Sequence, residues 1–297
     1  MLPAPKQFAF QHPGLDRREQ HRENNETLDQ LWPQANIIII DLQGNARFQE
    51  NSQALVFLTG ADFFVLRPAE ASYLGQADDQ HWFAVRAESI EDLPSHAIDL
   101  RTAAATWPHL QASIFAQARA LLYWQERNHF CGACGHALNL VRGGFMAKCE
   151  SCGSEHYPRT DAAVIMAVTD GEKILLGRQA SWPENRWSVL AGFLEPGESL
   201  EQTVIREVFE EAGVHVDRAE YGASQPWPFP ASLMLGFHAY AQPQDAKAGD
   251  ELEQVRWFSA EELRAGVASG ELGISPRMSI SRWLIEDWCG RMGVSLA

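Results

Sequence analysis

The 297-residue chain is poor in basic residues, with 24 Lys and Arg against 39 Asp and Glu, and its formal net charge is −15. A strongly acidic protein is poorly suited to binding nucleic acid through its backbone phosphates. If the substrate carries phosphate groups, we therefore expect a metal cation to mediate their binding. The hydrophobic content of 45% is that of an ordinary globular protein, long enough for more than one domain.

The sequence also lacks a hydrophobic run as long as a membrane-spanning helix, and its N-terminus, MLPAPKQFAF, has no secretory pattern. The C-terminal SLA resembles the peroxisomal signal SKL only loosely. We find no internal repeat and no low-complexity tract. These absences predict a soluble, cytoplasmic protein.

The portion up to about residue 111 carries no chemical motif, and we expect it to be a scaffold or a support for a dimer. Its short runs of β-branched and aromatic residues predict β-strands, for example at residues 36–41, 55–58, 63–66 and 82–85. From Ser113 to about Arg127, apolar residues recur at a helical period and predict a helix. Farther on, Asp170-Gly171 between the apolar runs 162–168 and 173–177 predicts a β-hairpin.

Cysteine is scarce, but four of the five residues form two C-x-x-C pairs, Cys131 with Cys134 and Cys149 with Cys152. Two such pairs can supply four thiolates to a tetrahedral zinc ion, and four protein ligands leave no open position for catalysis. The spacing therefore predicts a structural zinc site. Disulfides or a redox pair are alternatives, which a reducing compartment and the duplicated spacing disfavour.

Other residues near the cysteines are secondary candidates. His136 and His156 are spare zinc ligands, and Cys289 is expected to be a packed thiol. A zinc ribbon often binds nucleic acid, but the loop between the two pairs carries only Arg142 and Lys148 as cations, which makes this role weak.

The segment 192–214 predicts a loop followed by an acidic helix. Ser199 and Gln202 have the spacing of a capping box, and Gly213 is placed to end the helix. Glu207, Glu210 and Glu211 fall within one arc, while an adjoining arc is expected to pack against a sheet; it comprises Val204, Ile205, Val208, Phe209 and Ala212.

Such a glutamate cluster can be simply a charged surface, but its surroundings favour a metal site. Arg206 and Glu198 can pair and hold the loop against the helix, and Gly192 and Gly197 permit a tight backbone. Clustered carboxylates suit Mg²⁺ or Mn²⁺, which take their remaining ligands from water and phosphate.

The stretch SQPWPFPAS, residues 224–232, alternates prolines with large side chains. Each proline fixes its own φ and keeps the preceding residue out of the helical region, so we expect an extended segment that does not pair regularly in a sheet. It is either a stiff connector or a preorganised wall that presents Gln225, Trp227 and Phe229 to a flat ligand.

The acidic segment resembles the Nudix box at every fixed position, namely Gly192, Glu198, Arg206, Glu207, Val208, Glu210, Glu211, Gly213 and Val214. The resemblance implies a metal-dependent hydrolase of nucleoside diphosphate derivatives with an α/β/α sandwich and a mixed sheet. SQPWPFPAS, shortly after the box, resembles the signature of the NADH pyrophosphatase branch. That branch implies an α+β fold with a β-rich domain at 1–125, a zinc ribbon at 126–158 and a Nudix domain at 159–297.

The same resemblance implies cleavage of NAD(H) to NMN(H) and AMP, and removal of NAD caps from RNA by bacterial members. Phe193 and Tyr157, the latter from the second subunit of a homodimer, would sandwich the nicotinamide, and Ser281, where relatives commonly carry Ala, would make a backbone contact. The nucleotide would be lined by Gln225, Pro226, Trp227, Pro228, Phe229, Pro230, Ala231 and Ser232. Trp227 and Phe229 have an alternative role as core residues.

For the catalytic Mg²⁺ or Mn²⁺, the resemblance implies ligands from Glu207, Glu210, Glu211, Glu251 and the carbonyl of Ala191, with Glu253 competing with Glu251. Gly192, Glu198, Arg206 and Gly213 would be structural, and either Glu210 or Glu211 would be the base.

Two alternatives stay open at this point. One is a Nudix hydrolase for ADP-ribose, dinucleoside polyphosphates or oxidised nucleotides, and the other is a non-catalytic regulator that senses NAD or nucleic acid. The sequence does not rank free NADH against NAD-capped RNA.

Overall fold

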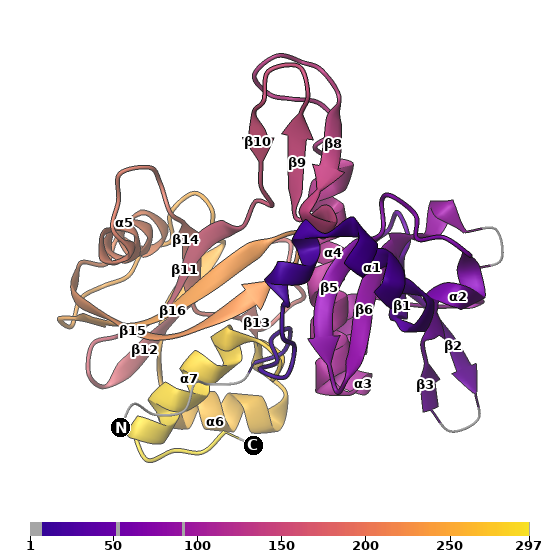
Figure 1. Cartoon of the computed structure of the whole chain (residues 1–297). Coiled ribbons are helices and arrows are strands. Elements are labelled where there is room, and N and C mark those ends of the chain that lie inside the picture. Colours follow the sequence, from indigo (N-terminus) through magenta and orange to yellow (C-terminus); the bar gives the residue numbers. More distant parts are fainter. Residues whose placement is uncertain (1–7, 52–53, 91–92, 297) are drawn as a thin grey trace, which may run out of the picture. The chain divides into compact units, whose positions relative to one another are not determined.

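The computed structural model (Figure 1) describes residues 8–51, 54–90 and 93–296 of the chain. It divides into two compact units. The first in the chain comprises Ala9–Thr160 and Pro228–Ala231, and the second comprises Met1–Phe8, Asp161–Trp227 and Ser232–Ala297. Within the described ranges, no helix is both long and apolar enough to cross a membrane.

The first unit is built on a mixed sheet with the strand order β3-β2-β1-β6-β5, in which β4 also pairs with β1 and β7 with β2. Strands β1 and β6 are parallel and the other pairs are antiparallel. The strands are β1 (Asn36–Ile40), β2 (Ala46–Asn51), β3 (Ala54–Val56), β4 (Leu58–Thr59), β5 (Ser72–Ala77), β6 (Gln80–Arg86) and β7 (His96–Ile98).

Short helices surround this sheet, and its buried face is apolar because alternate residues of β1 point into one cluster with Trp32, Tyr73 and Phe83. The helices are η1 (Glu19–Glu23), α1 (Asn25–Leu31), η2 (Trp32–Gln34), α2 (Gly60–Phe63), η3 (Ala87–Ser89), α3 (Leu100–Thr106) and α4 (His109–Glu126). Helix α4 packs against β1, β5 and β6.

The predicted strands at 36–41 and 82–85 and the helix at 113–127 are confirmed by β1, β6 and α4. The run 55–58 is divided between β3 and β4. The strand predicted at 63–66 is wrong, because α2 ends at Phe63 and the next residues are not in a strand. Val65 and Leu66 are 95% and 82% exposed, so their apolar side chains do not pack against the sheet.

The cysteine-rich part of this unit is a three-stranded sheet with the order β10-β9-β8. Its elements are β8 (Leu138–Val141), η4 (Arg142–Gly144), β9 (Met146–Cys149) and β10 (Glu155–His156).

The second unit is an α/β/α sandwich around a sheet of order β15-β16-β11-β12-β17, with β14 paired to β11. Strands β11 and β16 are parallel, and β13 and β18 form a small separate sheet. Its elements are β11 (Asp161–Thr169), β12 (Lys173–Arg178), β13 (Arg186–Trp187), β14 (Leu190–Phe193), α5 (Leu200–Ala212), β15 (Val216–Trp227), β16 (Ser232–Ala241), β17 (Gln254–Ser259), α6 (Ala260–Ser269), β18 (Gly273–Ile274) and α7 (Ile280–Arg291).

The two faces of this sheet bury separate apolar clusters because side chains alternate along β11. Val164, Met166 and Val168 pack with α5 on one face, whereas Ile165 and Ala167 pack with α6 and α7 on the other. Figure 1 shows α5 on one side of the sheet and α6 and α7 on the opposite side. The predicted hairpin at 162–177 is confirmed by the antiparallel pairing of β11 with β12.

Two expectations about this unit are wrong in part. On α5, Val204, Val208 and Ala212 are buried as predicted, but Ile205 and Phe209 are 42% and 50% exposed. The buried residues recur every four positions along the helix. Ile205 and Phe209 each follow a buried residue directly, so they are rotated by about 100° around the helix axis and face solvent. The ring of Phe209 packs instead beside His215, with centroids 4.8 Å apart.

SQPWPFPAS does not run extended throughout. Its first four residues end β15 and pair with β16, with Trp227 opposite Ser232, and residues 228–231 form the turn between the strands. The Phe229–Pro230 peptide bond is cis. Pro226 is tolerated in a paired strand because β15 lies at the edge of the sheet, where a missing N–H has no inward partner to lose.

Candidate active site

The site is built on the loop and helix that follow β14. Ser199 and Gln202 exchange the two hydrogen bonds of a capping box, and Gly213 ends α5 in the left-handed conformation at φ 65°. Both signals were predicted, and both are confirmed. They fix the start and the end of the helix that carries the glutamates.

Arg206 is the hub that attaches the loop to this helix. Its Nε and Nη2 donate to the two carboxylate oxygens of Glu198 at 2.6 and 2.9 Å. Nη2 also donates to the carbonyl of Phe193 at 2.9 Å, and Nη1 donates to Glu207 at 2.8 Å and to Glu210 at 3.0 Å. Hydrogen bonds from Arg206 lower the pKa of Glu198 to about 2, so this pair stays ionised.

Glu198 receives two further hydrogen bonds that the sequence did not predict, from the hydroxyl of Thr203 at 3.0 Å and from the backbone N–H of Glu195 at 3.1 Å. Thr203 lies one residue beyond Gln202 of the predicted capping box and is fully buried. The position of this hydroxyl, one turn after the N-cap residue Ser199, was the sequence feature that could have indicated the contact with Glu198.

Gly192 allows the strand to pass directly against the glutamates. A Cβ at this position would overlap the carboxylate of Glu207. Glycine is therefore required by the close approach, since its own φ is ordinary.

Glu211 is the most buried acid of the site, at 6% exposure. Burial, with the charges of Glu207 and Glu251, raises its pKa to about 8, although a hydrogen bond from the Ala191 backbone opposes this. Burial also raises the pKa of Glu207, with Arg206 acting in the opposite direction. Among the residues that the structure describes, Glu211 Oε2 has no hydrogen-bond partner.

The carboxylates of Glu207, Glu211 and Glu251 thus lie near one another, and Arg206 alone does not balance their negative charge. Glu251 acts electrostatically on both Glu207 and Glu211. Its competitor Glu253 is instead paired with Arg178. Hard oxygen donors with an unpartnered buried oxygen are the donor set that a divalent cation requires. Glu210 lies at the rim, with a side chain that is 58% exposed.

The aromatic residues predicted to hold the nicotinamide are both accessible. Phe193 ends β14 and is 60% exposed, and Tyr157 is 54% exposed, with its hydroxyl donating to Glu155 at 2.7 Å. They belong to different compact units.

Gln225 is fully buried. Its side-chain nitrogen donates to the Met278 carbonyl at 2.8 Å, and its oxygen accepts from the Ile280 N–H at 2.7 Å. It therefore supports the start of α7 from β15. At the other end of the motif, the ring of Phe229 lies beneath the guanidinium of Arg101, at 3.8 Å, and contacts Phe10 edge-on.

Ser281 is buried in a group of three hydroxyls. Its Oγ lies 2.8 Å from that of Ser188 and 2.9 Å from that of Ser275. Ser188 and Ser275 were not predicted as its neighbours, because Ser188 lies far from Ser281 in the chain and neither residue belongs to a recognisable motif.

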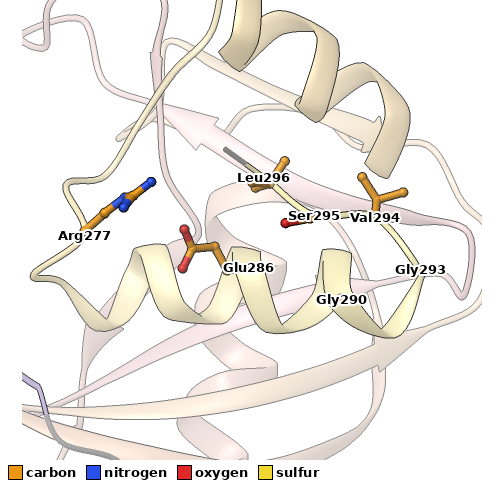
Figure 2. Close-up of a pocket in the computed structure, with 7 residues that line it drawn as sticks. All are labelled: Arg277, Glu286, Gly290, Gly293, Val294, Ser295 and Leu296. Carbon is orange, nitrogen blue, oxygen red and sulfur yellow. The ribbon is translucent and has the colours of Figure 1, made fainter.

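A hollow of about 600 Å³ lies between α7 and the C-terminal segment (Figure 2). It is lined by Arg277, Glu286, Gly290, Gly293, Val294, Ser295 and Leu296. None of the residues predicted from the sequence lines it, and it offers one carboxylate where the glutamate site gathers three. The glutamates are therefore the candidate active site.

The four paired cysteines converge in the zinc-ribbon sheet, with all four sulfur atoms within 4.8 Å of one another. None is in a disulfide. Hydrogen bonds from the Ala133 backbone and from His156 lower the pKa of Cys131 to about 5, which favours the thiolate that zinc binds. The four thiols fit a tetrahedral zinc ion.

The two spare zinc ligands predicted from the sequence, His136 and His156, make different contacts. His156 Nε2 lies 3.4 Å from Cys131 Sγ, so this residue supports a cysteine, whereas His136 contacts the carbonyl of Cys134. Cys289 is fully buried, and burial raises its pKa to about 12, so the predicted packed thiol is confirmed.

Three family models match consecutive parts of the chain. They are the NADH pyrophosphatase-like rudimentary NUDIX domain over residues 35–124, the NADH pyrophosphatase zinc ribbon domain over 126–157 and the NUDIX domain over 158–278. The N-terminal portion is therefore itself related to the C-terminal domain. This relationship is not visible in the sequence as an internal repeat.

Three curated relatives match this chain over different lengths. The NAD-capped RNA hydrolase NudC of Mycobacterium bovis is 35% identical over 291 residues, which cover 93% of this chain and 92% of that protein. The NAD-capped RNA hydrolase NudC of Stutzerimonas stutzeri is 43% identical over 57% of this chain and 58% of its own length. The human NAD-capped RNA hydrolase NUDT12 is 42% identical over 60% of this chain and 42% of its own length.

The sandwich and the glutamate site define a Nudix-type hydrolase. The chain belongs to the NADH pyrophosphatase (NudC-like) branch of the Nudix hydrolase family. Enzymes of this family depend on divalent cations, which agrees with the crowded carboxylates.

Proposed function

We propose that this enzyme hydrolyses the pyrophosphate bond of NAD(H) to NMN(H) and AMP and removes NAD caps from the 5′ ends of RNA. The observation that carries the proposal is the gathering of Glu207, Glu211 and Glu251 against the strand at Gly192. Relatives named as NAD-capped RNA hydrolases supply the substrate class.

Glu207, Glu211, Glu251 and the carbonyl of Ala191 would hold Mg²⁺ or Mn²⁺, with Glu210 at the rim. Bound cations supply charge neutralisation at the diphosphate and a lowered pKa for the attacking water. Either Glu210 or Glu211 accepts the proton from that water. Arg206 orients Glu207 and Glu210 through its two hydrogen bonds, and Gly192, Glu198 and Gly213 keep the loop and helix in place.

For substrate binding, Phe193 and Tyr157 stack on the nicotinamide, with Tyr157 supplied by the second subunit of a homodimer. The exposure of both rings supports this role. Residues 225–232 line the nucleotide and Ser281 contributes a backbone contact. Within this set, Gln225 acts by holding the start of α7, because both ends of its amide are engaged there.

We also propose the domain division 1–125, 126–158 and 159–297, with Zn²⁺ in a structural role at Cys131, Cys134, Cys149 and Cys152. A cytoplasmic location agrees with the absence of any disulfide among the cysteines.

The test is product analysis by chromatography with the zinc-loaded protein and added Mg²⁺ or Mn²⁺. NADH should yield AMP and NMNH, and NAD-capped RNA should yield NMN and a 5′-phosphate end. An enzyme that cleaves ADP-ribose or dinucleoside polyphosphates but leaves NADH intact would contradict the proposal. A protein that binds NADH without cleaving it would instead be a regulator.

A further inference from the structure

A pair of arginines meets at the turn of SQPWPFPAS, within the first compact unit. The guanidinium carbon of Arg101, on α3, lies 3.8 Å from the ring centroid of Phe229, and that of Arg119, on α4, lies 5.1 Å from it. Arg119 also donates to the carbonyls of Pro228 and Gly44, which fixes its position. Two cations are thus held on one aromatic ring.

The positive charge continues along α4. Arg119 and Tyr123 lie on α4, and Arg127 is its C-cap residue. At four-residue spacing the three lie within an arc of about 80° and span about 12 Å along the helix axis. The guanidinium carbon of Arg127 lies 3.9 Å from the ring centroid of Tyr123. We call Arg101, Arg119, Tyr123 and Arg127 the arginine track.

None of these arginines forms an ion pair with a carboxylate of the described residues. Glu126 shares this side of α4 but is engaged by Arg86 at 2.8 Å. Asp99 is the acid nearest in sequence to Arg101, and its carboxylate accepts the N–H groups of Arg101 and Thr102 at the start of α3. Burial lowers the pKa of Arg119, and the positive charge of Arg101 lowers it further, so the two cations repel each other. Hydrogen bonds from Thr102 lower the pKa of Asp99, and the charge of Arg101 also contributes, although the side chains of Arg101 and Asp99 form no ion pair.

A guanidinium stacked on a ring leaves its N–H edge free for a phosphate, and alternating cations and aromatic rings are how proteins follow single-stranded nucleic acid. Phe229 is two residues from Trp227 along the chain, a span of at most about 7 Å. The track therefore begins next to the segment proposed to line the nucleotide.

We propose that the arginine track binds the sugar–phosphate backbone of the RNA that follows the NAD cap. This inference rests on the proposed function, and it names the residues that distinguish capped RNA from free NADH. A net charge of −15 does not exclude RNA on this view, because the track is a local cationic strip whose arginines form no ion pair with a carboxylate of the described residues.

The experiment compares Arg127→Gln and Arg101→Gln, singly and together, with a matched control, Arg264→Gln. Arg264 is exposed on α6, and it forms no ion pair with a residue that the structure describes, so the control removes the same charge elsewhere. Arg119 is left intact because its loss would free two carbonyls. Binding of a fluorescent 5′-NAD-capped oligoribonucleotide is measured by anisotropy over a range of salt concentrations, and cleavage of NADH and of capped RNA is measured in parallel.

We expect the double variant to bind capped RNA roughly tenfold more weakly. The slope of log affinity against log salt should fall by about 0.7 for each RNA phosphate that the protein no longer neutralises. Arg127→Gln, which does not touch Phe229, should lower kcat/KM for capped RNA and spare kcat/KM for NADH. The control should behave like the parent enzyme.

Unchanged affinity and salt slope in the double variant, or an equal loss in the control, would overturn the arginine track. Failure of the parent enzyme to cleave NADH would overturn the proposed function instead, and the binding measurement would still decide whether the track holds RNA.

Discussion

The two Nudix-related sheets of this chain have the same strand plan, but only one of them carries an acidic helix. In each sheet a hairpin (β1–β2 or β11–β12) lies beside a parallel partner (β6 or β16), which pairs in turn with an antiparallel edge strand (β5 or β15). A further strand pairs with the second hairpin strand, β7 in one case and β17 in the other, and two helices follow it.

The difference lies at the position of the acidic helix. Strand β14 pairs with β11 and leads into α5, and β4 pairs with β1 and leads into α2. Helix α5 has 13 residues, whereas α2 has four, Gly60–Phe63. Glu207 and Glu211 need two consecutive turns to share one face, so a single turn cannot carry both. The sheet is therefore a scaffold common to both units, and the chemistry depends on the length and sequence of one helix.

The comparison is tested most strongly by Glu211→Gln. The substitution removes a buried carboxylate, proposed above as a metal ligand, that has no counterpart in α2, so kcat should fall by roughly a thousandfold or more at saturating Mg²⁺. Steady-state kinetics measure the loss, while circular dichroism and zinc content should match the parent enzyme. Retained turnover would place the chemistry elsewhere.

Alanine substitutions of one glycine in each unit then distinguish an effect on catalysis from an effect on stability. In Gly192→Ala the new methyl overlaps the Glu207 carboxylate, and we expect kcat to fall by about a hundredfold as that ligand is displaced. In Gly60→Ala the methyl overlaps the backbone and ring of Trp32, which should cost about 1–3 kcal/mol of unfolding free energy and leave kcat of the folded enzyme near normal. Loss of kcat in Gly60→Ala together with normal kcat in Gly192→Ala would contradict this division between site and scaffold.

The pH dependence of stability sharpens the comparison further. Without added Mg²⁺ or Mn²⁺, the pKa of Glu211 in the folded protein is about 8, above its unfolded value, so the folded state binds more protons. This contribution to stability is fully present below about pH 4.5 and is lost as the pH rises to about 8, at about 1.4 kcal/mol per pKa unit. Melting temperatures should therefore fall over this range. Glu211→Gln should flatten the profile, as should saturating Mg²⁺; an identical profile in the variant would refute the assignment.

The smallest effect is expected at the helix cap. Ser199→Ala removes the side-chain acceptor of the capping box and should cost about 1 kcal/mol of unfolding free energy. Denaturant melts should show this loss with little change in kcat at 25 °C, because Arg206 still holds the loop through Glu198. A large fall in kcat would mean that the cap itself orients the glutamates.

Predictions that depend on interactions between residues close together in the sequence were correct. The capping box, the glycine stop, the hairpin at Asp170-Gly171 and the four-cysteine spacing each depend on residues a few positions apart, and each was found in place. Predictions that depend on packing against residues far away in the chain were wrong. The apolar run at 63–66 does not form a strand, and the side chains of Ile205 and Phe209 are not buried in the core.

The sequence by itself determined the helix of glutamates, its termini and the cluster of four cysteines, because hydrogen bonds and ligand geometry over short spacings admit few alternatives. Only the tertiary structure decided that Glu251 and not Glu253 stands beside those glutamates, that Gln225 supports α7, and that Phe229 lies beneath an arginine. Each of these contacts joins residues far apart in the chain or chooses between near neighbours, and packing, which depends on the whole fold, settles the choice.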